Sequence, residues 1–399
     1  MKCRTTILTD RQTDRQTDRQ TDRQTDRQAG IELLKLIAMF LIVLFHVSIT
    51  VSRGASDELP SISQQFINVG VATTNIQYLI IGLFHHLGAL GNLIFFVCSF
   101  WFLSSSKGVK LNKILLMILD VWVISVLFLL VIIQFENLPM GLIIKCLFPN
   151  SFCNSWFVTC YLIIYAIHPL LNQVIDSMNK KGHVSFCLIS VMLYNFWVFL
   201  LGDVLFSSRL IQTIVLYFLV SYIKKYTLDW IENIKLNGAL LIIGITGVVA
   251  MYLFTNYLAL HYSVFNNHIL RWASTTRNNP FIVLSALALF NLFGRVRISC
   301  RTINYISGLS MLIYLLHENV LFKTYTRVRI WAHILSMYGE TKIVLLSVAF
   351  AIVLFMVSIL IAFLYTNSIH RLVIRIEKHV GPFVVKSYDY ILGLVMKVQ

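Results

Sequence analysis

Long apolar stretches separated by short polar segments follow one another along the chain from residue 33 to residue 366. A helix needs about 20 apolar residues to cross the hydrocarbon core of a bilayer. The pattern therefore predicts ten membrane-spanning helices, with the second interrupted by polar side chains and the eighth short. The predicted spans are 33–52, 77–103, 114–135, 157–178, 184–201, 208–223, 238–258, 280–294, 303–322 and 342–366.

Composition supports the same fold class. Hydrophobic residues make up 57% of the chain and charged residues only 13%, with a mean hydropathy of +0.75. A soluble domain carries about 25% charged residues. We therefore expect an all-α polytopic integral membrane protein. The net charge of +15 is typical of cytoplasmic loops in such proteins, and it does not call for nucleic acid as a partner.

The loops predict an orientation. With the N-terminus in the cytoplasm, sixteen Lys and Arg residues fall inside and nine outside, leaving out the N-terminal segment. This bias favours both termini in the cytoplasm. Four of the nine lie in the last outside loop, as Lys323, Arg327, Arg329 and Lys342. From residue 370, HRLVIRIEKHVGPF alternates basic and apolar residues, so we expect 367–399 to form a basic amphipathic tail on the inner membrane surface.

The N-terminal segment 1–29 contains five perfect copies of TDRQ, from Thr9 to Gln28. The repeat has no apolar face to offset its ordering entropy, so we expect a disordered tail without a structural role. The tetranucleotide GACA, repeated and read in threes, encodes Asp, Arg, Gln and Thr. We therefore interpret the repeat as a translated tetranucleotide tract that makes expression phase-variable. The repeat precedes the first apolar stretch and no small-residue cleavage site follows, so no cleavable signal peptide is expected.

The first predicted span, GIELLKLIAMFLIVLFHV, carries three polar side chains in a line. Lys35 and His46 are eleven positions apart, which places them near one helix face and about 16 Å apart along the axis. Glu32 falls near the same face. Ionisable groups at such depth cost free energy, so they persist where they line a cavity or take part in chemistry. His46 is therefore a candidate general base.

Structural alternatives exist for these residues. Lys35 can extend its ammonium to the headgroups, and His46 can pack two helices through a hydrogen bond. The adjacent residues His85 and His86 do not share a helix face, and the seven cysteines form no CxxC pair. We expect no metal site and no redox role for the cysteines.

Four segments together resemble the membrane acyltransferase 3 family, multi-pass acyltransferases that modify bacterial surface glycans. Glu32, Lys35 and His46 resemble the family's acidic residue, Arg and His, with Lys in place of Arg. GNLIFFVCSFWFL is similar to the second-helix pattern at Ser99, although Phe100 stands where Gly is usual. WFVTCYLIIYAIHPLLN, which begins at Trp156, and ISGLSMLIYLLHE, which carries Tyr314, His317 and Glu318, resemble two later helices. The resemblance spans about residues 30–366.

The resemblance implies transfer of an acyl group, most often from acetyl-CoA, across the bacterial inner membrane to a sugar hydroxyl of a glycan or glycolipid. We expect lipopolysaccharide as the acceptor. His46 would be the base and Glu32 would orient it. Lys35, Ser99, Lys107 and Lys113 would meet the acyl-CoA. Whether an acyl-histidine forms first stays open.

Four further residues are candidates for binding the acceptor, and each has a structural alternative. Tyr314 and His317 share a face and could line the acceptor path or simply pack. Trp156 could stack on a sugar or anchor the helix at the membrane interface. Arg271 could meet an anionic glycan or be a solvated loop charge.

Two other functions compete with acetyl transfer. Ten helices with intramembrane charges also suit a glycolipid transporter or flippase that performs no acyl transfer. The sequence shows no clear repeat of halves and no pair of Gly/Pro-broken helices, while the ordered Glu, Lys and His favour the enzyme. A third alternative is transfer of a succinyl or longer acyl group.

Overall fold

The computed structural model describes residues 30–51, 72–106, 108–152, 155–197, 209–265, 279–296 and 300–396. Every regular element in these ranges is a helix, which confirms the predicted all-α class. The TDRQ repeat lies outside them. The helices are Gly30–Val51, here called the first helix, α3 (Ile76–Leu103), α4 (Leu111–Ile132), α5 (Met140–Leu147), α6 (Trp156–Ser177), α7 (Lys180–Val191), α9 (Arg209–Tyr226), α10 (Leu228–Glu232), α11 (Ile234–His261), α13 (Pro280–Phe293), α14 (Arg301–Gly308), α15 (Ser310–His317), α16 (Val328–Tyr338), α17 (Ile343–Asn367) and α18 (Ile369–Met396).

Six helices in the described ranges are long and apolar enough to cross a membrane. They have 22 to 28 residues, or about 33 to 42 Å of helix against a hydrocarbon core of about 30 Å. They are the first helix, α3, α4, α6, α11 and α17 with the turn before it. The other four predicted spans coincide with α7, α9, α13 and the pair α14–α15, which are shorter or less apolar. The count of ten and the cytoplasmic termini stay predictions.

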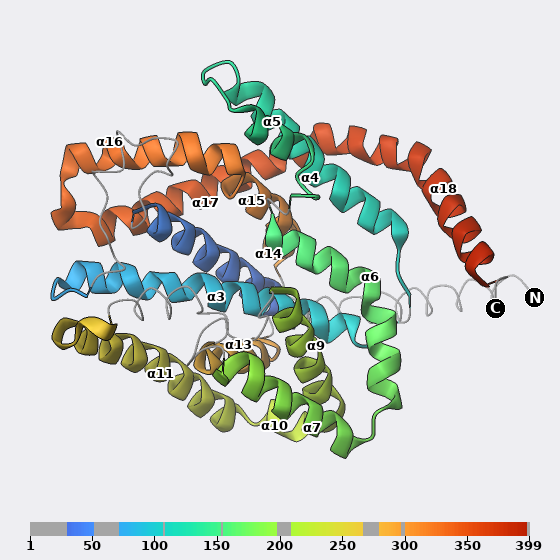
Figure 1. Ribbon diagram of the computed structural model, residues 1–399, viewed down its shortest axis with the longest axis horizontal. Coiled ribbons are helices and arrows are strands. Elements are labelled where there is room, and N and C mark those ends of the chain that lie inside the picture. The colour runs from blue at the N-terminus through green and yellow to red at the C-terminus, as the bar shows by residue number, and fades with distance from the viewer. Residues whose placement is uncertain are drawn as a thin grey trace, which may run out of the picture.

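The first helix and α3 lie side by side at the centre of the bundle (Figure 1). They are the most buried of the six spans, because helices pack against them from both sides. An added Cβ at Gly91 on α3 would lie only 2.5 Å from the carbonyl oxygen of Ala38. Gly88 faces the ring of Phe45 as closely. These glycines let the two helices approach each other, which fixes the position of the helix that carries His46.

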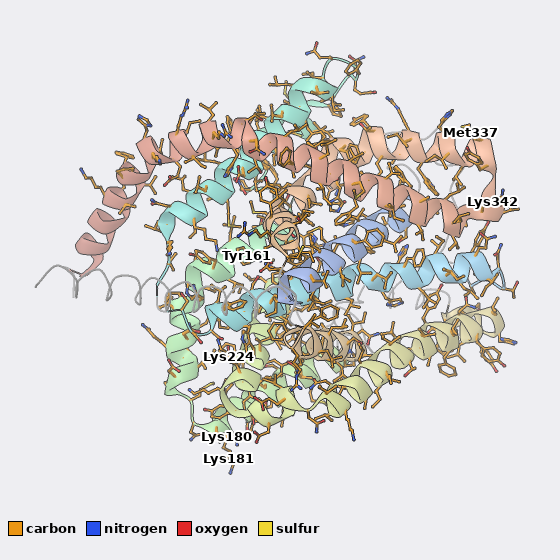
Figure 2. All side chains as sticks on the ribbon, turned by 180° about the vertical axis from the view of Figure 1, so that it is seen from behind. Tyr161, Lys180, Lys181, Lys224, Met337 and Lys342 are labelled. Carbon is orange, nitrogen blue, oxygen red and sulfur yellow. The ribbon has the colours of Figure 1, made fainter. Side chains whose placement is uncertain are left out.

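The basic residues separate toward two ends of the bundle. Figure 2 shows Lys180, Lys181 and Lys224, all predicted for inside loops, at one end of the molecule. Lys342, predicted for the last outside loop, lies at the opposite end. These four positions agree with the predicted alternation, and the orientation of the chain in the membrane stays a prediction.

The segment from Lys323 to Lys342 is helical, although the sequence predicts an outside loop there. A π-helical turn, η4 (Phe322–Arg327), leads directly into α16. Three of its four basic side chains are in ion pairs, with Lys323 and Arg327 on Glu318 and Arg329 on Glu136. In a count of basic residues, these charges fall on the outside and so oppose the predicted orientation. In the structure, three of them are in ion pairs.

The C-terminal segment forms the long helix α18, which packs on α4 and α17. Asp120, buried on α4, anchors this junction. Its Oδ1 accepts hydrogen bonds from the Tyr365 hydroxyl at 2.7 Å and from His370 Nδ1 at 2.8 Å. The amphipathic helix therefore begins at a fixed point on the bundle, and its place on the inner membrane surface stays a prediction.

Candidate active site

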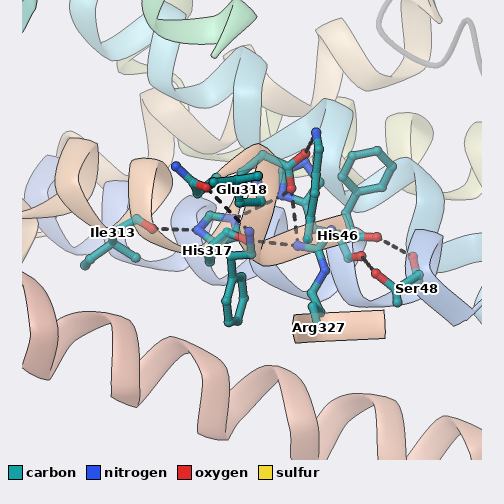
Figure 3. A network of polar contacts seen from close by, with 12 residues as sticks. His46, Ser48, Ile313, His317, Glu318 and Arg327 are labelled. Atoms are coloured by element: carbon teal, nitrogen blue, oxygen red, sulfur yellow. Dashed lines mark hydrogen bonds and ion pairs between the residues drawn. The ribbon is translucent and has the colours of Figure 1, made fainter. Parts of the chain in front are cut away.

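Two histidines from distant parts of the chain meet at the centre of the bundle (Figure 3). His46 on the first helix and His317 at the end of α15 are 3.0 Å apart, measured from Nδ1 of His46 to Nε2 of His317. The carboxylate of Glu318 approaches the same Nδ1 of His46 to 3.4 Å. Both histidines are buried, with exposed fractions of 7% and 0%. The predicted base therefore lies beside a second imidazole and a carboxylate.

The hydrogen bonds assign the protons of the two rings. His317 Nδ1 lies 2.6 Å from the carbonyl oxygen of Ile313, which can only accept, so this nitrogen carries the proton and donates. In a neutral ring, His317 Nε2 is then an acceptor. It accepts from Nδ1–H of His46. The contacts of His46 described here all use Nδ1, so its Nε2 keeps a lone pair that can take a proton.

Glu318 is held by two cations. Lys323 Nζ lies 2.8 Å from one of its carboxylate oxygens, and Arg327 Nη1 lies 3.2 Å from the other. Arg327 also donates to the carbonyl oxygen of His317 at 2.9 Å. Arg327 is only 3% exposed, and a buried charge is tolerated only when it is paired and hydrogen-bonded. The cluster fixes both the carboxylate and the end of α15.

The local fold explains how these cations reach Glu318. After His317 the helix stops, and Asn319 Oδ1 accepts a hydrogen bond from the backbone N–H of Leu321 at 3.0 Å. The π-helical turn η4 then directs Lys323 and Arg327 back toward Glu318. Such turns are rare and are found most often at functional sites.

An aromatic line connects the histidines to the start of α6. The ring of Tyr314 lies 6.3 Å from His46 and 5.8 Å from His317, centroid to centroid. Phe157 lies 5.5 Å from Tyr314, and Trp156 lies 5.9 Å from Phe157. Tyr314 and His317, both predicted for the acceptor side, therefore lie at His46. Trp156 reaches it through Phe157 and Tyr314.

A polar stripe follows α14 and α15 toward the same histidines. Asn304, Ser307, Ser310, Tyr314 and His317 are separated by three, three, four and three positions, which places them on one helix face. Asn304 Oδ1, Ser307 Oγ and Ser310 Oγ are shielded from solvent and find no hydrogen-bond partner among the described residues. Buried polar atoms of this kind are costly unless a ligand or water satisfies them.

Glu32, the predicted orienting carboxylate, and Lys35, a predicted acyl-CoA contact, lie on the first helix well before His46. Glu32 and Lys35 form an ion pair of 2.7 Å. Glu32 precedes His46 by fourteen positions, or about 21 Å along the helix. The carboxylate at the base therefore comes from Glu318 and not from Glu32, because a straight helix cannot bring its first turn to its last. Ser99 is half-buried on α3 and directly follows the buried Cys98.

Lys113 lies at the start of α4 and packs on an aromatic pair of α6. Its Nζ lies 4.7 Å from the centre of the Tyr165 ring and 3.4 Å from the Tyr161 hydroxyl. Lys107 and Arg271 lie outside the described residues. Within the described part of the chain, no three His, Cys, Asp or Glu side chains gather in a way that could hold a metal ion.

Several site residues carry a signal in the sequence other than a family motif. Glu318 stands directly after the predicted His317, and Lys323 and Arg327 follow it in a segment predicted to be a loop. Asn304, Ser307 and Ser310 repeat at helical spacing through an otherwise apolar span, and this repeat is the signal that could have identified them.

Comparison with known families bears on what this cluster does. A family model described as an acyltransferase domain, acyltransferase 3, matches residues 28–367. The chain belongs to the acyltransferase 3 family. This confirms the resemblance and makes the protein a membrane acyltransferase. The acyltransferase match begins just before the first helix and ends with α17, so it includes both histidines and the Glu318 cluster. No curated protein and no solved structure matches the chain.

Proposed function

We propose that this acyltransferase moves an acetyl group from acetyl-CoA, bound from the cytoplasm, to a sugar hydroxyl of a bacterial surface glycan, with lipopolysaccharide as the first acceptor to test. The observation that carries the proposal is the ordered chain from the Ile313 carbonyl through His317 to His46. It holds His46 in the tautomer whose Nε2 is a base.

The chemistry needs only one proton carrier. His46 Nε2 takes the proton of the sugar hydroxyl as its oxygen attacks the thioester carbonyl carbon. The carbon–sulfur bond breaks, the acetyl group becomes an ester of the sugar, and the departing thiolate receives the proton from Nε2. General base catalysis of this kind contributes about 10²- to 10⁴-fold in rate.

Glu318 suits the role of stabilising the charged intermediate state of His46. When His46 holds the extra proton, its imidazolium faces the Glu318 carboxylate at 3.4 Å. Lys323 and Arg327 fix that carboxylate before the reaction begins. Preorganised charges in a site shielded from water stabilise developing charge more than mobile ones do.

The polar stripe suits the donor. The amides and thioester of the acyl-CoA arm need hydrogen-bond partners inside the bundle, and Asn304, Ser307 and Ser310 offer unsatisfied ones. The stripe rises by about 20 Å from Asn304 to His317, the scale of an extended arm. Lys35 and Lys113 remain the proposed phosphate contacts. The tight burial of His46 and His317 favours a small acyl group such as acetyl over succinyl.

The test is mass spectrometry of the surface glycans of the host. It compares the intact gene, a deletion and His46→Ala at equal protein level, with His183→Ala as the control. His183 is also fully buried but bonds the Phe218 carbonyl away from the cluster. We expect the mass increment of acetyl to disappear in the deletion and in His46→Ala only. Unchanged acylation with less glycan at the surface would instead support a glycolipid transporter.

The TDRQ repeat supports a separate proposal about expression in a bacterial inner membrane. A tract of tetranucleotides changes length by whole units, and each unit shifts the reading frame. Sequencing single colonies should recover tract lengths that differ by one unit, with acetylation present in only one frame. A tract of constant length would contradict phase variation.

A further inference from the structure

A large apolar cavity lies between α7, α9, α11 and α13, on the side of the bundle opposite α17. Its volume is about 630 Å³. Its walls are formed mainly by aliphatic and aromatic side chains, among them Leu188, Tyr222, Leu240, Phe281 and Leu284. An apolar space of this size in a membrane protein suits a hydrocarbon chain.

The cavity is long as well as wide. Along α13 it reaches from Pro280 to Asn291, a rise of about 16 Å. That is about half of the 30 Å hydrocarbon core. Its walls on α11 belong to a helix that exposes large apolar side chains, such as Ile242 and Ile243. A chain of a membrane lipid can therefore meet continuous apolar surface along the cavity.

A small cavity with several polar side chains in its lining adjoins the apolar one. It has a volume of about 30 Å³ and shares Asn195, Leu219 and Val283 with its larger neighbour. The guanidinium of Arg209 stacks over the ring of Trp156 at 4.7 Å. Asn92 Oδ1, which is buried, finds no hydrogen-bond partner among the described residues. A cation and an unsatisfied polar atom thus stand beside an apolar hollow.

One wall of the small cavity connects to the histidines through packed aromatic rings. Trp156, which lines it, contacts Phe157, and Phe157 contacts Tyr314 beside His46. An ordinary phospholipid filling the apolar cavity would not need Trp156, whose ring joins the small cavity to the catalytic cluster. A ligand with a hydrocarbon chain, an anionic group and a sugar would use all three regions in order.

We propose that the apolar cavity holds the hydrocarbon chain of a lipid-linked acceptor, a glycan joined to its lipid through a phosphate. Arg209 binds the phosphate and Trp156 receives the first sugar, so that later hydroxyls reach His46. The inference rests on the proposed acyl transfer and names the chemical class of its acceptor.

Binding of farnesyl phosphate to the purified, full-length protein tests the proposal. Native mass spectrometry would measure it for the wild type, Leu284→Trp, Leu240→Trp, Arg209→Gln and Leu345→Trp. Leu284 on α13 and Leu240 on α11 both line the cavity, so either tryptophan fills it if the other variant fails to fold. Leu345 is exposed on α17 and is the matched control.

We expect both cavity-filling variants to weaken binding about tenfold or more, and Leu345→Trp to leave it unchanged. Arg209→Gln should weaken the binding of farnesyl phosphate to the level measured for farnesol, which lacks the phosphate. Unchanged binding in the filled variants, or equal displacement by dioleoylphosphatidylglycerol, would overturn the proposal. His46→Ala should bind the probe normally while losing acyl transfer. Failure of the lipid site can therefore be told apart from failure of the proposed chemistry.

Discussion

The two sides of the central helices are filled in opposite ways. Toward α15 and η4, His46 on the first helix meets His317, a carboxylate and two cations that bond one another. Toward α7, α9, α11 and α13, the bundle has an apolar cavity of about 630 Å³ that is partly open at its surface. In an apolar environment, charged groups must be closely paired, whereas a space for a lipid must hold few polar groups. The comparison separates the region that needs rigidity from the region that needs room.

Removing the partner of His46 should give the largest effect on the polar side. In His317→Leu, the acceptor 3.0 Å from His46 Nδ1 is lost and only the more distant Glu318 carboxylate, at 3.4 Å, remains, so the correct tautomer is held less firmly. We expect acyl transfer to fall by about 100-fold or more. His317→Gln can still accept through its amide oxygen and should recover most of the activity. Rates measured in proteoliposomes would check both variants, and equal rates for Leu and wild type would exclude this role.

The ion cluster should be the largest single contributor to stability on this side. Arg327→Leu leaves the buried Glu318 with only Lys323, so we expect a loss of about 3–5 kcal/mol in the free energy of unfolding. The pair of Arg329 with Glu136, in which only Arg329 is exposed, provides the control, since Arg329→Leu should cost about 0–1 kcal/mol. Denaturant titration in micelles measures both. Restored stability in Arg327→Leu with Glu318→Gln would confirm that the unpaired carboxylate causes the loss.

Sequence and structure agree best where a residue's role follows from its own position. The all-α class can be predicted from the lengths of the apolar stretches, and His46, Tyr314 and His317 can be predicted from local motifs. These three side chains lie together in the structure. The contacts of Lys323 and Arg327 with Glu318 cannot be predicted in this way, because the turn η4 brings residues five and nine positions away onto that carboxylate. The apolar cavity cannot be predicted from the sequence either. Its lining has the same composition as a lipid-facing or packed surface, and only the arrangement of four helices leaves it open.

The contact between the central helices connects both sides. In Gly91→Ala, the new methyl would lie 2.5 Å from the Ala38 carbonyl, so the first helix must shift. We expect a loss of about 1–3 kcal/mol in unfolding free energy, together with lower acyl transfer because His46 moves with its helix. Gly238→Ala on α11 meets no atom within 4 Å and should gain about 0.5–1 kcal/mol. Equal stability of the two variants would contradict the close approach.

The polar stripe should give the smallest effect, and one that separates binding from folding. Ser307 Oγ has no partner among the described residues, so Ser307→Ala should not destabilise the protein. If the hydroxyl bonds the donor, its loss should cost about 1 kcal/mol of binding, or about fivefold in KM for acetyl-CoA. Ser347→Ala makes the same chemical change on α17, where the hydroxyl already bonds the Ile343 carbonyl. It should leave KM unchanged. A KM that rises in neither variant would remove the stripe from the donor path, while the histidine pair would keep its role.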